Sequence, residues 1–380
     1  MKKKILFLVN SLSFFISHRL EIAIAARDNG YEVCVGYGEL GNTNTAILFE
    51  KGIDCIKFPL ERRSINPFKE IWSLFSIWQI IYKLKPDIVH LITIKVYLYG
   101  GISARLAKVP CVVSAIAGLG ILFNQRNLSN FLFQKLFYLG FIFAFNHPNQ
   151  KVIVQNPEDK KTLVKWGVID LKKILLFRGS GVNLSNFTSL SESSDIVTVC
   201  FASRLLHDKG TFDFVAAARI IKKKGIKVKF LLAGNLDPGN LNSLTKQDID
   251  NIKKEHVVEV LDYQKDISVL YARSNIVCLP SFYGEGLPKS LIEAAAASRA
   301  VVTTDAPGCR DAIIPNKTGL LVPVKDPQKL ADALQWLIEH PQERIAMGKA
   351  GRKLAEKEFR IEKIVQDHLN IYKQLISSQC

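Results

Sequence analysis

The sequence has no Cys-x-x-Cys pair among its seven cysteines, which lie far apart along 380 residues. This spacing indicates neither a zinc site nor a disulfide framework. Cys200 and Cys278 fall inside the apolar runs Val197–Ala202 and Asn275–Pro280. Such positions are typical of reduced cysteines in the core of a cytosolic protein.

Long hydrophobic runs are missing as well. The chain starts with MKKKILFLVN, whose apolar stretch from Ile5 to Val9 is too short for the apolar region of a signal peptide. No run of about 18 uncharged apolar residues occurs, so no transmembrane helix is predicted. The length favours two domains, and the composition, 48% hydrophobic and 23% charged, is that of a folded chain.

Acidic residues are absent from residues 88–157, a stretch of 70 residues. An even spread of the 35 acidic residues would place about six there. Residues 1–178 hold 24 Lys and Arg against 12 Asp and Glu, so they carry +12 of the net charge of +16. A basic region of this kind attracts anionic partners, either phospholipid headgroups or nucleic acid.

Short apolar runs alternate with helical patterns along the chain and predict strands separated by helices. The predicted strands of the first half are Lys4–Asn10, Tyr31–Gly36, Asp54–Phe58, Asp87–Leu91, Pro110–Ala115, Lys151–Val154 and Lys172–Phe177. Those of the second half are Ile196–Ala202, Lys227–Ala233, Val257–Leu261, Asn275–Pro280, Ala300–Thr304 and Gly319–Pro323. The predicted helices include Arg19–Asn29, Pro67–Lys83, Val96–Lys108 and a final helix over Phe359–Ile376.

Near-continuous apolar strands joined by helices favour parallel sheets covered on both faces. Two runs of such strands predict two doubly wound, Rossmann-like α/β domains. The break between them is predicted at Arg178–Asp195, a segment rich in Gly, Ser and Asn. In this fold ligands bind beyond the carboxyl ends of the strands, so ligand-binding and catalytic residues are expected there.

Two cations follow the strand Ile196–Ala202. Arg204 and Lys209 lie between this strand and a helix expected from about Thr211. An arginine fork and a lysine point charge in such a turn suit a diphosphate, although two solvated surface cations would give the same pattern.

Two carboxylates follow the strand Asn275–Pro280. Glu285 is expected in the loop before a helix that starts near Pro288, and Glu293 on the second turn of that helix. Backbone N–H groups at Gly286 and Leu287 would face a phosphate, Glu293 the hydroxyls of a ribose, and Glu285 the hydroxyls of a sugar. The neighbours of Glu293 are almost all apolar, so its carboxylate needs a partner.

Together these residues resemble glycosyltransferase family 4. The resemblance rests on Glu285-x7-Glu293, Arg204 with Lys209, Gly234 in the LLAGN segment, and the final helix. Further marks match a bacterial subgroup of capsule, O-antigen and N-glycan assembly enzymes: Ser17-His18-Arg19-Leu20, Pro86-Asp87-Ile88-Val89-His90, Gly118-Leu119-Gly120 with Phe123, Gly179-Ser180-Gly181-Val182 and Asp305–Asp311. They span essentially the whole chain.

The resemblance implies the GT-B architecture, with two Rossmann-like domains facing across a cleft. An acceptor-binding, membrane-facing domain would cover residues 1–178, a linker 179–195 and a nucleotide-sugar-binding domain 196–358. A helix over 359–380 would cross back to the first domain. Arg204 and Lys209 would bind the donor diphosphate, Glu285 the transferred sugar and Glu293 the ribose, with Gly234, Gly286 and Leu287 beside the donor; Glu285, Arg204 and Lys209 would be catalytic.

The activity implied is a retaining transfer from a UDP-sugar, typically an N-acetylhexosamine or related amino sugar, to a polyprenyl-diphosphate-linked saccharide. The enzyme would work at the cytoplasmic face of the inner membrane without a cofactor or metal. Asp248-x-Asp250 spells a metal-binding signature, but it lies in a polar helical stretch where such a match arises by chance. A GDP-sugar donor and a soluble or different lipid acceptor stay open.

The acceptor side departs from the family pattern. Many retaining relatives carry a histidine after the fifth strand, where this chain has Ser114-Ala115-Ile116-Ala117-Gly118. His18, His90 and Gly118 are therefore the acceptor-side candidates. A histidine next to a strand is as often a structural hydrogen-bonding residue.

The stretch Asn130–Phe145 has seven aromatic residues and one charge. It is predicted either to pack on the first sheet or to lie in the headgroup region of a membrane. In the second case the contacts would be Lys95, Lys108, Arg126, Phe131, Phe133, Lys135, Phe137, Phe141 and Lys151.

Three other functions share parts of these features. A basic nucleic-acid-binding protein fits the pI of about 9.4, but the cations follow no recognition motif. A phosphorylase would need a pyridoxal phosphate lysine, and an epimerase lacks the Glu-x7-Glu pairing in this context. A binding module without turnover would not require all of Arg204, Lys209, Glu285 and Glu293.

Overall fold

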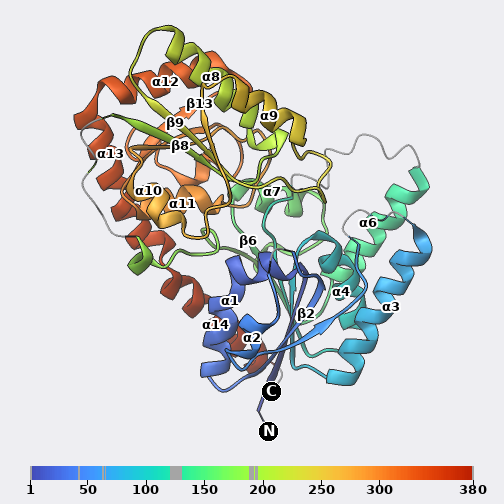
Figure 1. Ribbon diagram of the computed structural model, residues 1–380. Coiled ribbons are helices and arrows are strands. Elements are labelled where there is room, and N and C mark those ends of the chain that lie inside the picture. Colours follow the sequence, from blue (N-terminus) through green and yellow to red (C-terminus); the bar gives the residue numbers. More distant parts are fainter. Residues whose placement is uncertain are drawn as a thin grey trace. The chain divides into compact units, whose positions relative to one another are not determined.

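The computed structural model describes residues 2–41, 43–61, 64, 66–119, 131–187, 192 and 196–378, and residues 131–137 by their backbone alone. The chain divides into two compact units (Figure 1). Unit 1 holds Met1–Ser180 and Glu362–Cys380, and unit 2 holds Gly181–Ile361. Within the described residues, no helix combines the length and hydropathy that crossing a membrane requires.

Unit 1 is built on a seven-stranded parallel sheet with the order β3-β2-β1-β4-β5-β6-β7. Its strands are β1 (Lys4–Ser11), β2 (Glu32–Glu39), β3 (Asp54–Lys57), β4 (Ile88–Ile92), β5 (Cys111–Ala115), β6 (Gln150–Val154) and β7 (Ile174–Leu176). The central strands are buried along their whole length, as the near-continuous apolar runs predict.

Helices cover both faces of this sheet. One face carries α1 (Leu12–Asp28), α2 (Ala46–Phe49) and the final helix α14 (Ile361–Ser377), which share one apolar cluster with the strands. The other face carries α3 (Pro67–Leu84), α4 (Ile94–Leu106), α6 (Phe131–Phe145) and α7 (Pro157–Lys165). Figure 1 shows α3, α4 and α6 together at one side of the unit.

Unit 2 repeats the design with six parallel strands in the order β10-β9-β8-β11-β12-β13. The strands are β8 (Thr198–Ala202), β9 (Lys229–Ala233), β10 (Glu259–Leu261), β11 (Ile276–Leu279), β12 (Ala300–Thr304) and β13 (Gly319–Val322). The helices are α8 (Thr211–Lys223), α9 (Lys246–Lys254), α10 (Ile267–Ala272), α11 (Lys289–Ala296), α12 (Pro327–Glu339) and α13 (Pro341–Leu354), followed by a π-helical turn over Ala355–Phe359.

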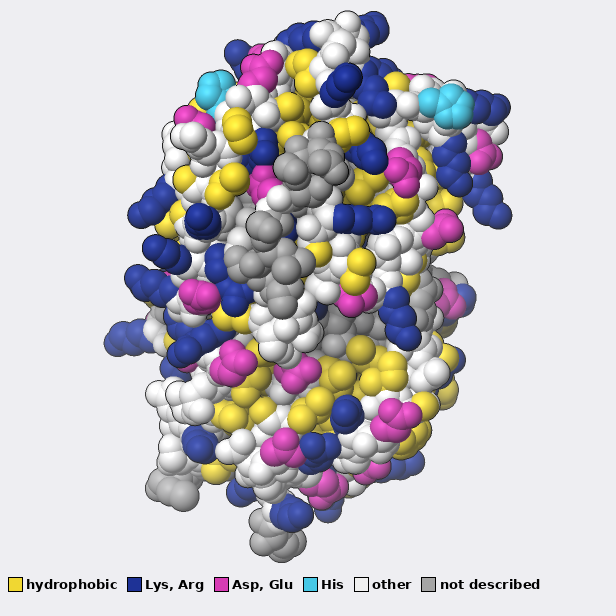
Figure 2. All heavy atoms as spheres, turned by 60° about the vertical axis from the view of Figure 1, so that its left-hand side comes forward, with side chains coloured by type: hydrophobic (Ala, Val, Ile, Leu, Met, Phe, Trp, Pro, Cys, Tyr) yellow, Lys and Arg dark blue, Asp and Glu magenta, His cyan; other side chains and the backbone are white. Residues whose placement is uncertain are grey.

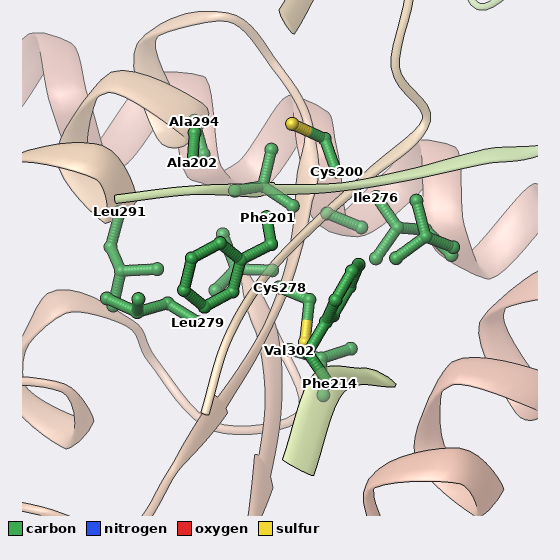
Figure 3. Packing of buried hydrophobic residues seen from close by; sticks show 14 of the residues in the cluster. Cys200, Phe201, Ala202, Phe214, Ile276, Cys278, Leu279, Leu291, Ala294 and Val302 are labelled. Atoms are coloured by element: carbon green, nitrogen blue, oxygen red, sulfur yellow. The ribbon is translucent and has the colours of Figure 1, made fainter. Parts of the chain in front are cut away.

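The core of unit 2 forms where β8 and β11 meet the helices around them (Figure 3). The rings of Phe201 on β8 and Phe214 on α8 lie 5.5 Å apart. Cys200 and Cys278 are fully buried in the same cluster, as predicted. Burial raises the pKa of the Cys200 thiol to about 12, so this thiol stays protonated and unreactive at neutral pH.

All thirteen predicted strands are confirmed, and the differences concern the ends of elements. The first helix starts at Leu12, not at Arg19, because Leu12 and Phe15 already pack against the sheet. The predicted strand Lys172–Phe177 is shortened to β7, since a 3-10 turn occupies Leu171–Lys173. Both cases show tertiary packing deciding where an element begins.

One buried ion pair in unit 2 joins residues far apart in the sequence, Glu192 and Arg344. Glu192 lies 2.8 Å from Arg344 of α13, and it also accepts a hydrogen bond of 2.9 Å from Asn275. Asn275 in turn accepts from the backbone N–H of Thr198 at the start of β8. Glu192 is therefore joined both to the sheet, through Asn275, and to α13, through Arg344.

Removing one partner of this pair leaves a buried charge uncompensated. We expect Arg344→Ala to lower the free energy of unfolding by about 3–5 kcal/mol, seen as a lower Tm in differential scanning calorimetry. The exposed pair of Arg219 with Glu255 is the matched control, and Arg219→Ala should cost about 1 kcal/mol or less. Equal losses in the two variants would contradict the role of burial.

Candidate active site

The residues that the sequence singled out in the second half gather at one edge of the unit 2 sheet. From β8 the chain passes outward to β9, whereas β11 leads outward in the opposite direction to β12. The carboxyl ends of β8 and β11 therefore flank the point where the strand order reverses, which is where doubly wound sheets bind ligands.

The loops after β8 and β11 are tied together directly. The backbone carbonyl of Asp208 accepts hydrogen bonds from the Ser281 hydroxyl, at 3.0 Å, and from the Phe282 N–H, at 3.1 Å. Gly210 follows with a φ of +75°, and a Cβ there would lie 2.1 Å from the Pro280 carbonyl oxygen. Only glycine permits this approach, so the two loops meet at a fixed distance.

This junction brings Lys209 and Glu285 into contact. The Lys209 ammonium donates to the Glu285 carboxylate, and each side chain is only 11% exposed. Residues 76 positions apart in the sequence thus form a nearly buried ion pair at the carboxyl edge. The sequence predicted both positions for the site, and the structure brings them together.

The loop after β12 contacts the backbone of Glu285 and of the next residue. The Glu285 N–H donates to the Pro307 carbonyl at 3.3 Å. Gly308, with a φ of +81°, would place a Cβ 2.3 Å from the Gly286 carbonyl oxygen. The turn at Asp305–Asp311 therefore packs against the backbone of Glu285 and Gly286 and fixes its position. A 3-10 turn over Arg310–Ala312 follows at the end of this segment.

Arg204 occupies a different place from Lys209. Its guanidinium is half exposed and lies 2.8 Å from the carboxylate of Asp237, in the loop after β9. Gly234 precedes that loop, and a Cβ there would lie 1.8 Å from the Ser203 carbonyl oxygen. Gly234 thus has a steric role, because it lets the loops after β8 and β9 approach each other.

Glu293 lies on the second turn of α11, as predicted, and its partner is Lys289 one turn earlier, at 3.6 Å. The carboxylate is 14% exposed. Burial raises its pKa to about 7, against the opposing effect of Lys289. Pro288 is the residue before the helix and not its first residue, and Leu287 is buried in the core.

Asp248 is accounted for by helix capping. Its carboxylate accepts hydrogen bonds from the Thr245 N–H, at 2.8 Å, and from the Thr245 hydroxyl, at 2.7 Å. The Thr245 hydroxyl accepts in return from the Asp248 N–H, which completes a capping box at the start of α9.

The acceptor-side candidates of unit 1 separate into two groups. His18 on α1 is partly exposed, stacks on Phe14 and lies 2.6 Å from the Ser17 hydroxyl. Gly118 follows β5 with a φ of +106°. Both come after the carboxyl ends of strands, at the edge where the doubly wound fold binds ligands.

His90 lies inside β4, fully buried, with its Nδ1 2.7 Å from the hydroxyl of Tyr372 on α14. Burial, and then the neighbouring His368 and Arg19, hold its pKa well below the usual range. A structural hydrogen bond, the alternative that the sequence left open, is therefore what the structure shows for His90.

Two of the membrane contacts predicted from the sequence face the interior of unit 1. Lys95 turns inward, where its ammonium donates to Glu70 and to the carbonyls of Glu61 and Ser64. Phe141 is buried against the sheet. Arg126, Gly120 and Phe123 lie outside the described residues, as do the side chains of Phe131, Phe133, Lys135 and Phe137.

Two features of the site escaped the sequence reasoning. Asp237, the partner of Arg204, stands in the LDPG turn after β9, and only its place beyond a strand could have marked it. The steric need for Gly210 could have been suspected from a glycine directly after Lys209, at the start of a helix.

Two doubly wound parallel sheets in one chain are the architecture of the GT-B glycosyltransferases. Two family profiles match: "Glycosyl transferase 4-like" over residues 4–156 and "Glycosyl transferases group 1" over residues 185–354. The chain belongs to glycosyltransferase family 4.

Curated relatives agree with this assignment. The chain is 26% identical to the N,N'-diacetylbacillosaminyl-diphospho-undecaprenol alpha-1,3-N-acetylgalactosaminyltransferase of Campylobacter jejuni, over 96% of this chain and 99% of that protein. It is 27% identical to the UDP-Gal:alpha-D-GlcNAc-diphosphoundecaprenol alpha-1,3-galactosyltransferase of Escherichia coli, over 72% of this chain and 71% of that protein.

Solved structures share the fold over nearly the full length. The sucrose-phosphate synthase of Thermosynechococcus elongatus aligns with a TM-score of 0.80 at 21% identity, covering 99% of this chain and 100% of that one. Anabaena Alr3699/HepE, in complex with UDP and glucose, aligns with a TM-score of 0.78 at 19% identity, covering 98% and 99%.

The raised pKa of Glu293 makes stability depend on pH. The folded state binds this proton more tightly than the unfolded state, so its contribution is full below about pH 4.5 and is lost as the pH rises to about 7. Without ligand, we expect Glu293→Gln to be more stable than the wild type at pH 8, by at most about 3 kcal/mol.

Thermal unfolding at pH 4.5 and pH 8 tests this. At pH 4.5 the variant and the wild type should have the same Tm, because both then carry a neutral side chain. Glu343→Gln, at an exposed position of α13, is the control and should change Tm at neither pH. A stabilisation of Glu293→Gln that is equal at both pH values would contradict the titration of Glu293.

Proposed function

We propose that this enzyme transfers an N-acetylhexosamine or related amino sugar from a UDP-sugar to a polyprenyl-diphosphate-linked saccharide, with retention of configuration. It would act in the assembly of a bacterial surface polysaccharide or glycan, at the cytoplasmic face of the inner membrane. The observation that carries the proposal is the Lys209–Glu285 pair at the switch point of the unit 2 sheet.

The names of the relatives support the choice of donor and acceptor. The Campylobacter jejuni protein, which matches almost the full length, is named for transfer of N-acetylgalactosamine to a diphospho-undecaprenol saccharide. The Escherichia coli protein is named for a UDP-sugar donor and a diphosphoundecaprenol acceptor. Both names share an acceptor linked to undecaprenyl diphosphate. The UDP-sugar donor comes from the Escherichia coli name alone, and the transferred amino sugar from the Campylobacter jejuni name alone.

The residues of unit 2 divide the chemistry among them. Lys209 and Arg204 would stabilise the negative charge that develops on the leaving diphosphate. Glu285 would accept hydrogen bonds from the sugar and Glu293 from the ribose. The new bond forms between the sugar C1 and the acceptor oxygen while the bond from C1 to phosphate oxygen breaks, and the acceptor proton passes to the leaving diphosphate.

We propose no metal in this reaction, since two protein cations supply the positive charge. The Asp-x-Asp sequence at Asp248 and Asp250 supports no ligand role, because Asp248 caps α9. A nucleic-acid partner is not proposed either. Figure 2 shows one face of the molecule, on which Lys and Arg side chains are spread out with Asp and Glu between them.

Lys209→Ala tests the catalytic assignment. It removes the cation beside the leaving group and leaves the Glu285 carboxylate without its ion pair, so we expect kcat to fall by about 10²–10³-fold, with weaker donor binding. Lys246→Ala, an exposed lysine at the start of α9 in the same unit, is the control and should keep wild-type kcat. Turnover near normal in Lys209→Ala would refute the assignment.

A panel of UDP- and GDP-sugars, with and without a prenyl-diphosphate-linked saccharide, tests the whole reaction by nucleotide release and product analysis. We expect one UDP-amino sugar to be consumed, only with the lipid-linked acceptor, and at an unchanged rate in EDTA. Consumption with a soluble saccharide alone, or of a GDP-sugar, would replace the proposed acceptor or donor. Loss of activity in EDTA would refute the metal-independent reaction.

A further inference from the structure

Helix α3 of unit 1 exposes a large apolar face. Phe68, 84% exposed, and Trp72, 58% exposed, share it with Ile71, Phe75 and Tyr82, which are also exposed. These positions recur at intervals of three, four and seven residues, so they lie on one side of the helix. We call this surface, made of Phe68, Ile71, Trp72, Phe75 and Tyr82, the α3 face.

The α3 face is not the side by which the helix packs. Ser73, Ile77 and Ile81 are the buried residues of α3, and they face the sheet and α4. The helix is therefore apolar on two sides, whereas a surface helix usually turns one apolar stripe inward and a polar side to water. An aromatic surface of this size marks an interaction site.

The aromatic rings along α3 support one another. Ring centroids lie 5.9 Å apart for Trp72 and Phe75, and 5.8 Å apart for Phe75 and Trp78. Trp78 and Tyr82 continue the series at 5.2 Å. Tryptophan and tyrosine are the residues that favour the boundary between lipid and water, because their rings are apolar and their N–H and O–H groups polar.

The carboxylate of α3 does not lie on the α3 face. The one carboxylate on α3, Glu70, turns toward α4, where the Lys95 ammonium lies 2.9 Å away and the Tyr99 hydroxyl donates to it. At the other end of the helix, Lys83 and Lys85 are exposed. The exposed carboxylate near the first turn, that of Glu61, is paired with Lys69 of α3 at 2.7 Å. An aromatic face flanked by lysines, with its nearby carboxylates paired, complements an anionic bilayer.

The position of α3 in the fold gives this face a direction. The helix connects β3 to β4, which run parallel in one sheet, so its first turn lies at the carboxyl edge of the strands and its last turn at the opposite edge. Phe68, the most exposed residue of the α3 face, therefore lies toward the edge where a Rossmann-like unit binds its ligand.

We propose that the α3 face beds into the headgroup region of an anionic bilayer and so places the carboxyl edge of the unit 1 sheet beside the membrane. This contact explains why an exposed aromatic helix carries its only carboxylate turned inward. The docking proposal rests on the proposed function in one respect: an acceptor that stays in the bilayer gives the enzyme a reason to bind there.

Vesicle co-sedimentation of the full chain tests the docking. With vesicles of phosphatidylcholine and phosphatidylglycerol, we expect Phe68→Ser with Trp72→Ser to weaken binding about tenfold or more. Phe49→Ser is the matched control, because Phe49 is 57% exposed on α2, on the other face of the sheet. Binding that is unchanged in the double variant, or lost equally in the control, would overturn the proposal.

The charge contribution is tested separately. Lys83→Glu with Lys85→Glu should reduce binding to the level seen with phosphatidylcholine vesicles alone, while Lys253→Glu with Lys254→Glu, at exposed positions of unit 2, should not. Equal losses in the two charge variants would mean that attraction is general to the molecule, against the proposal. A wild-type dimer that becomes a monomer in Phe68→Ser with Trp72→Ser, without vesicle binding by either, would assign the face to a second copy.

Activity with a short-chain prenyl-diphosphate acceptor in detergent separates docking from catalysis. The variant with Phe68→Ser and Trp72→Ser should turn this acceptor over within about twofold of the wild-type rate, because Lys209 and Glu285 belong to unit 2 and both changed residues to unit 1. A chain that binds vesicles through α3 but transfers no sugar would keep the docking and overturn the proposed function.

Discussion

The junction between the loops after β8 and β11 is the contact on which the site of unit 2 depends. A buried lysine and glutamate lose solvation, and their attraction compensates only when their geometry is fixed. Here neutral contacts fix it: the Asp208 carbonyl accepts from Ser281 and Phe282, and Gly210 abuts Pro280. The loops that carry the two charges are thus joined by contacts that involve neither charged side chain.

This arrangement has a cost for the ligand that enters. A diphosphate that binds Lys209 must compete with Glu285, which already holds the ammonium. In the proposed reaction one anion would replace another as the partner of Lys209. Glu285 would then accept hydrogen bonds from other donors, such as sugar hydroxyls, and Lys209 would link the binding of the diphosphate to that of the sugar.

Much of the fold follows from the sequence, because strands buried on both faces must be apolar throughout. The nearness of Lys209 and Glu285 follows as well, from the rule that carboxyl ends of parallel strands share an edge. The pairing of Arg204 with Asp237 does not. It depends on the conformation of a loop 33 residues away, which is held by the hydrogen bond from the Asp237 N–H to Ser243.

Surface features were the least predictable. Periodicity placed a helix at Pro67–Lys83, but both sides of that helix are apolar, so the pattern could not show which side faces the sheet. The aromatic stretch Asn130–Phe145 was the candidate membrane contact in the sequence, but Phe141 and Phe145 within it are buried in the core. His90 likewise has nothing in its sequence neighbourhood that reveals Tyr372, 282 residues away.

That distance has a consequence for synthesis. Ile364, His368 and Tyr372 of α14 are fully buried against a sheet whose strands all lie before residue 180. On the ribosome, one face of that sheet therefore has its strands, α1 and α2 but lacks α14 while the whole of unit 2 is translated. A nascent chain would hold an apolar surface open for that interval, which is the situation in which chaperones bind.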